Sequence, residues 1–133
     1  MEQKEIEKRV LEYQMLEQRM RDMQEQLMAA DQQLIDMVST ARSIEEIASI
    51  DDKKDMLVPI TNGIFTTASL RKSDTLLVNI GSSVVVEMSM DETKKLIEKQ
   101  REELKMLRTN ISENLKKFMK RASEIEKELK DII

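Results

Sequence analysis

The centre of the chain, residues 56–87, reads MLVPITNGIFTTASLRKSDTLLVNIGSSVVVE, and its pattern predicts the class of fold. It holds four short runs rich in β-branched and other apolar residues. The first two runs flank Asn62-Gly63, a dipeptide typical of tight hairpin turns. The last two flank Gly81-Ser82-Ser83 in the same way, and a polar turn, RKSD, separates the two pairs. The pattern therefore predicts two successive β-hairpins in the middle of the chain.

The predicted hairpins cannot bury both faces of their strands within one chain, and their edges invite further pairing. We therefore expect them to act as an assembly module that forms sheet with other subunits. The apolar residues predicted to make this oligomer contact are Val58, Ile60, Ile64, Phe65, Leu70, Leu77, Val78, Ile80, Val84, Val85 and Val86.

The segments on either side of the hairpins have the heptad spacing of coiled-coil helices. In the first fifty residues the apolar seam is Ile6, Val10, Tyr13, Leu16, Met20, Met23, Leu27, Ala30, Leu34, Met37, Ala41 and Ile44. The step of three from Tyr13 to Leu16 stands where four was due and is a stammer. The second seam is Ile97, Leu104, Leu107, Ile111, Leu115, Phe118, Ala122, Ile125, Leu129 and Ile132, with a stutter after Ile111.

The two helical segments are expected to pair with each other. Residues 1–50 carry 11 acidic and 6 basic side chains, whereas residues 92–133 carry 9 acidic and 12 basic. Opposite charge on helices of similar length favours an antiparallel hairpin within the chain. Paired residue numbers should then sum to about 138, which places Leu16 near Ala122.

The predicted organisation is an α+β fold in which a long antiparallel two-helix coiled coil carries two central β-hairpins that assemble into an oligomeric β-barrel platform. The three predicted segments are a coiled-coil helix over 1–50, the hairpins over 51–91 and a second coiled-coil helix over 92–133. Ser89 and Glu92 have the spacing of a capping box, which marks the start of the second helix.

Composition argues against several function classes. The chain of 133 residues is 36% charged and 2% aromatic, with 11 Met, 2 Gly, no His and no Cys. It therefore lacks imidazole and thiolate groups and cannot build a glycine-rich phosphate loop, so we expect no enzyme activity, no cofactor and no metal. The basic second helix interleaves nine acidic residues and has no aromatic stacking platform, so nucleic-acid binding is not expected.

The sequence also favours a soluble, cytoplasmic protein that has no membrane partner. No uninterrupted apolar stretch is long enough to cross a bilayer. The absence of cysteine fits a reducing compartment.

Residues 56–87 resemble the prefoldin family, and in particular its archaeal alpha-type subunits. The residues that carry the resemblance are Val58-Pro59, Phe65, Leu70 before the polar turn, Asp74, the strand ending Val78-Asn79-Ile80-Gly81, and Val86-Glu87. Two hairpins are similar to the alpha class, since the beta class carries one. The coiled-coil layout on either side extends the resemblance to nearly the whole chain.

The resemblance implies a hexamer of two alpha and four beta-type subunits on a double β-barrel platform. Six coiled-coil arms would hold non-native client proteins without ATP and pass them to a group II chaperonin. The alternative is a structural or tethering coiled coil that the β segment oligomerises and that binds no clients.

Apolar residues near the expected free end of the helix pair are the candidates for client contact: Leu11, Met15, Met119, Ile125, Leu129, Ile132 and Ile133. Of these, Leu11, Met15, Met119 and Ile133 fall outside the seam. Flexible Met and aliphatic side chains adapt to many apolar partners. Isolated exposed apolar residues are also ordinary on protein surfaces, so both interpretations stay open at this point.

Overall fold

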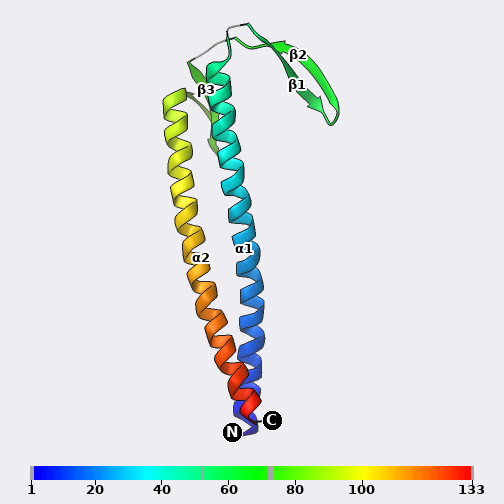
Figure 1. The fold of residues 1–133 in the computed structure, drawn as a ribbon, viewed down its shortest axis with the longest axis vertical. Helices are drawn as coiled ribbons and strands as arrows, with labels where there is room; N and C mark the ends of the chain where they lie inside the picture. The colour runs from blue at the N-terminus through cyan, green and yellow to red at the C-terminus, as the bar shows by residue number, and fades with distance from the viewer. Residues whose placement is uncertain (1, 52, 72–73, 133) are drawn as a thin grey trace. The chain divides into compact units, whose positions relative to one another are not determined.

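In a computed structural model of the chain, the sequence forms a long helix, then four strands, then a second long helix (Figure 1). The elements are α1 (Gln3–Ser49), β1 (Asp55–Thr61), β2 (Ile64–Ser69), β3 (Thr75–Gly81), β4 (Val84–Ser89) and α2 (Met90–Ile132). The structure describes residues 2–51, 53–71 and 74–132. Within these residues neither helix offers a stretch apolar enough to span a bilayer. The predicted pair of long helices and the two predicted hairpins are confirmed.

The chain divides into two units that we describe separately. The paired-helix unit comprises Met1–Asp36 and Arg101–Ile133, and the hairpin unit comprises Met37–Gln100. In the paired-helix unit the first part of α1 and the last part of α2 lie side by side and run in opposite directions (Figure 1). Its core is Leu16, Ala122 and Ile125, against which Tyr13, Met20, Phe118 and Leu129 pack. The predicted antiparallel pairing within the chain, with Leu16 near Ala122, is confirmed.

An arginine occupies a seam position of α2 that the sequence pattern gave to a leucine. Leu107 is 52% exposed, whereas the neighbouring Arg108 is half-buried and pairs with Asp31 of α1. With Arg108 in the seam, the steps from Leu104 to Leu115 alternate regularly between four and three. The predicted stutter is therefore wrong, because an apolar pattern cannot register a charged residue that occupies a heptad core position.

The predicted stammer in α1 is wrong for the same reason. Val10 is 40% exposed, and the half-buried Arg9 takes the seam position instead. Its Nε atom lies 2.9 Å from Oε2 of Glu128 on α2. The steps from Ile6 through Arg9 to Leu16 then alternate without interruption. At both sites, the irregular step in the apolar spacing marks the place where an arginine, Arg9 or Arg108, occupies the seam.

Each hairpin of the hairpin unit is an antiparallel strand pair with a two-residue turn. β1 pairs with β2 around Asn62-Gly63, and β3 pairs with β4 around Ser82-Ser83. Gly63 has φ = 79°, a left-handed value that glycine adopts without a Cβ clash. Ser82 and Ser83 have φ = 50° and 61°, and positive φ at both central residues is the requirement of a type I′ hairpin turn.

A serine caps the start of α2. The Ser89 hydroxyl oxygen accepts a hydrogen bond from the Glu92 backbone N–H at 3.1 Å, which satisfies one of the free donors of the first turn. The Thr93 hydroxyl donates to the Ser89 carbonyl at 2.8 Å, so this buried polar side chain also has a partner. Asp91 and Glu92 place negative charge at the positive end of the helix dipole. Helix α2 can therefore begin directly after β4, because these side chains provide hydrogen bonds and negative charge for its first turn.

Candidate interaction surfaces

The apolar side chains predicted for assembly lie on the hairpins, and most of them are exposed in the single chain. We define the hairpin surface as the predicted residues Val58, Ile60, Ile64, Phe65, Leu70, Leu77, Val78, Ile80, Val84, Val85 and Val86, together with Leu57. Leu70, Val78 and Val86 are half-buried, and the others are exposed, with Leu77 at 78%. Each hairpin thus carries a group of exposed apolar side chains, which is typical of an interaction site.

The two faces of the second hairpin differ in polarity. Val78 lies opposite Val86, and Asn79 lies opposite Val85. Because side chains alternate between the faces of a strand, Val78 and Val86 share one face, whereas Leu77 and Val85 belong to the other. This second face also carries Asn79 and Glu87, with Glu87 opposite Leu77, so the Val78–Val86 face is the one that most needs an apolar neighbour.

Leu57 is the hairpin-surface residue that the sequence prediction missed. It is 67% exposed and lies opposite Thr67 in the β1–β2 ladder. The available signal was its place in the uninterrupted run Met56-Leu57-Val58, where both alternating faces of the strand are apolar.

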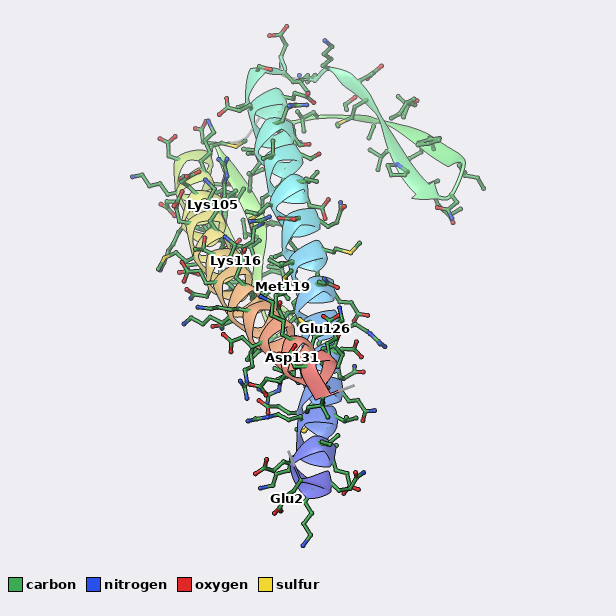
Figure 2. The ribbon with its side chains drawn as sticks, turned by 60° about the horizontal axis from the view of Figure 1, so that its bottom comes forward. Glu2, Lys105, Lys116, Met119, Glu126 and Asp131 are labelled. Atoms are coloured by element: carbon green, nitrogen blue, oxygen red, sulfur yellow. The ribbon has the colours of Figure 1, made fainter. Side chains whose placement is uncertain are left out.

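The residues predicted for client contact differ in exposure. Leu11, Met15 and Met119 each expose more than half of their surface, and Ile132 is exposed to a smaller degree. Figure 2 labels Met119 on α2, two helical turns before Glu126. Leu129 is half-buried against the core.

Two of the predicted contact residues need separate comment. Ile125 is fully buried in the core of the paired-helix unit. Its assignment to client contact is corrected, because a side chain without exposed surface cannot touch a client in this conformation. Ile133 lies outside the described residues.

Ion pairs close one flank of the paired helices. Nε of Arg121 donates to Oε1 of Glu12 at 2.9 Å, and Arg9 contacts both Glu12 and Glu128. The hydrogen bond from Arg121 holds the pKa of Glu12 below its ordinary value. On the same flank, the Arg19 guanidinium lies 5.8 Å from the Phe118 ring centroid, a cation–π distance.

The same chemistry recurs farther along the paired helices. Arg108 donates hydrogen bonds to both carboxylate oxygens of Asp31, which lowers the pKa of that carboxyl. Burial raises the pKa of the Tyr13 phenol, which packs against the core.

The opposite flank carries an open groove of about 380 Å³. Its apolar lining comes from Met20, Met119 and Ala122, and its rim includes Glu17, Arg21 and Glu126. Ala122 is a seam residue, and its small side chain leaves the space that a larger residue would fill. Across the described residues, no cluster of three or more acidic side chains has the arrangement of a metal site.

The sequence matches a known family over most of its length. A family model described as prefoldin subunit matches residues 12–133. The chain belongs to the prefoldin family. Prefoldin is a chaperone family, and this membership supports a chaperone-type role.

Individual proteins similar to this chain are alpha subunits of prefoldin. The prefoldin subunit alpha of Thermofilum pendens is 32% identical over 119 residues, which cover 90% of this chain and 92% of the relative. The prefoldin subunit alpha of Pyrococcus horikoshii is 30% identical over 135 residues, covering 97% and 83%. The resemblance to archaeal alpha-type prefoldin subunits is confirmed.

A solved structure shares the fold. The filamentous PFD from Methanocaldococcus jannaschii, determined by cryo-EM, matches with a TM-score of 0.80 over 88% of this chain and 97% of that chain. The sequence identity is 14%. The likeness therefore concerns the arrangement of helices and hairpins.

Proposed function

We propose that the chain is a chaperone subunit that binds non-native proteins on its paired helices without ATP. The observation that carries the proposal is the exposure of Leu11, Met15 and Met119, which lie outside the seam of the paired helices. These side chains contribute little to the core of the chain, and flexible apolar groups of this kind can adapt to varied partners. Membership of the prefoldin family supports the same role.

The proposed mechanism is reversible burial of apolar surface. An unfolded client exposes apolar side chains, and each square ångström of that surface removed from water contributes about 25 cal/mol. A single arm with a few exposed side chains binds weakly. Several arms that contact one client raise the effective concentration and hold it far more tightly. No chemical step is needed for capture, which fits a protein that has two glycines and no phosphate loop.

The proposed partners follow from the hairpin surface. The exposed apolar side chains of the hairpins need neighbours that cover them, and we propose beta-type prefoldin subunits as those neighbours, in a hexamer of two alpha and four beta subunits. The hairpins would close into β-barrels that remove their exposed edges. The bound client would then pass to a group II chaperonin. The likeness to alpha-type relatives supports this arrangement.

Light scattering tests the proposal. A chemically denatured protein is diluted into buffer that contains the purified complex and no nucleotide. We expect the complex to suppress the rise in scattering, because captured chains cannot aggregate. Unchanged aggregation at a molar excess of complex would contradict the chaperone proposal and favour the tethering alternative. Bovine serum albumin at the same mass concentration controls for non-specific protection.

A further inference from the structure

The open groove of the paired-helix unit lies on the flank opposite the Glu12–Arg121 ion pair. Glu12 directly precedes the seam residue Tyr13, whereas Glu17 directly follows the seam residue Leu16. Residues that precede and follow seam positions in this way flank the seam on opposite sides. The Glu12–Arg121 pair therefore closes one side, and the groove opens on the other.

The groove has an apolar floor of defined size. Met20 and Ala122 form its base from the two helices, and Met119, at 52% exposure, provides a movable wall. A volume of about 380 Å³ is enough for one large apolar side chain and its neighbours. The flexible thioether of Met119 can adjust to different occupants.

The ionisable side chains at the rim give the groove a net negative charge. Its ionisable side chains are the carboxylates of Glu17 and Glu126 and the guanidinium of Arg21, which leaves an excess of one negative charge. Glu126 also contacts Lys130 at 3.5 Å, but this pair joins two exposed side chains that solvent separates readily. A cationic side chain of a bound polypeptide can therefore replace Lys130 as the partner of Glu126.

We propose that this groove binds a large apolar side chain of a non-native polypeptide that has a lysine or arginine close to it in sequence. The inference rests on the proposed function and names the class of client segment that the groove selects. The apolar side chain occupies the space above Ala122, and the neighbouring cation lies between the carboxylates of Glu17 and Glu126.

Peptide binding tests the groove. Two fluorescein-labelled peptides of equal length share one Leu-Phe-Leu centre and carry either two lysines or two glutamates beside it, and their binding to the full-length complex is followed by fluorescence anisotropy. We expect the lysine peptide to bind about three- to tenfold more tightly at low salt, with the preference shrinking at high salt because ions screen the rim. Equal affinity of the two peptides at low salt would overturn the proposal.

Two charge variants separate the groove from the general field of the protein. The double variant Glu17→Gln/Glu126→Gln keeps the size of the rim and should reduce the lysine preference to less than about twofold. Glu25→Gln/Glu113→Gln makes the same charge change at exposed positions that do not line the groove, and should retain the preference. A preference that falls equally in both double variants would overturn the assignment to the groove.

A further pair of variants tests the apolar wall. Met119→Ser should weaken both peptides several-fold, whereas Met106→Ser, an equally simple change at an exposed α2 residue that does not line the groove, should leave both unchanged. Equal effects of the two substitutions would place the contact elsewhere. If the wild type suppresses aggregation but shows no lysine preference, the groove proposal fails and the chaperone proposal stands. If it does not suppress aggregation, the chaperone proposal fails and the groove has no client role.

Discussion

Val85 is a residue at which folding of the chain and assembly of the oligomer can be separated. It is 55% exposed on β4, so Asp at this position costs the isolated hairpin little. In an assembled platform the same charge would be buried without a partner and would cost several kcal/mol. We expect Val85→Asp to abolish the oligomer and leave the helical circular dichroism largely intact.

Size-exclusion chromatography with multi-angle light scattering measures this outcome. Leu107→Asp is the matched control, because Leu107 is equally exposed but lies on α2 and not on a hairpin. A Val85→Asp variant of full oligomer size would argue that the hairpin surface does not build the platform.

The Asp31–Arg108 pair makes stability depend on pH in a defined direction. Arg108 lowers the pKa of Asp31 from its ordinary value of 3.8, so the pair stabilises the folded state above that value. The contribution is lost as the pH falls through the lower, folded-state pKa. We expect Asp31→Asn to have a lower Tm than the wild type at pH 6, with the gap closing as the pH falls through the lowered pKa of Asp31.

Thermal unfolding followed at 222 nm measures this gap, with Glu25→Gln as the control for loss of an exposed carboxylate of α1. A gap of the same size at pH 6 and pH 2 would show that Asn disturbs the seam for a reason other than charge.

At the scale of the helix, the seam of α2 runs through Leu115 and Arg108 and leaves Leu107 outside. Leu115 is 9% exposed, and Leu115→Ala should cost about 2–4 kcal/mol because it leaves a cavity. Leu107→Ala should cost less than about 1 kcal/mol, since its side chain is already half in water. Urea unfolding measures both, and a larger cost at Leu107 would restore the stutter that the apolar spacing predicted.

At the scale of the hairpin, the second turn holds two serines in a backbone conformation that suits other residues better. Ser82 and Ser83 both have positive φ, whereas Asn-Gly is the preferred pair for such a turn. Replacing Ser82-Ser83 with Asn-Gly should stabilise the protein by about 0.5–1 kcal/mol in urea unfolding. Gly63→Ala, which adds a Cβ at φ = 79° in the first turn, should destabilise it. Destabilisation by the Asn-Gly replacement together with stabilisation by Gly63→Ala would contradict the backbone conformations assigned to the two turns.

The elements themselves were predictable because their signals are local. Heptad spacing, the Asn62-Gly63 turn and the Ser89 cap each depend on residues close together in sequence, and the structure has helices and hairpins where these signals predicted them. The seam positions of Arg9 and Arg108 were not predictable from apolar spacing, because each depends on an acidic partner on the other helix.

The candidate site was predictable only in part. Leu11, Met15 and Met119 were identified because they fall outside the heptad seam near the expected free end of the helix pair, and their exposure agrees with a position outside the seam. The burial of Ile125 depends on how the two helices interlock, which spacing along one helix does not show. The groove above Ala122 also depends on both helices, so it emerged only from the structure.

At the scale of the whole molecule, two sets of exposed apolar residues lie in the two units of the chain. We propose that the hairpin surface builds the oligomer and that side chains of the paired-helix unit capture clients. Each capture residue contributes modestly, so the oligomer is needed to place several weak contacts on one client. A variant that loses capture must therefore be compared with the wild type at the same oligomer size.

The most direct test is the aggregation assay with the triple variant Leu11→Ser/Met15→Ser/Met119→Ser, confirmed at native oligomer size. All three side chains are more than half exposed, so the changes leave the seam intact and remove only apolar surface. The matched control is Met28→Ser/Ile35→Ser/Met106→Ser, which removes three side chains that are at least as exposed from other positions of the paired-helix unit. We predict that the first variant loses most of the suppression of aggregation and that the control retains it. Full suppression by the first variant, or equal loss in both, would contradict the assignment of client capture to these residues.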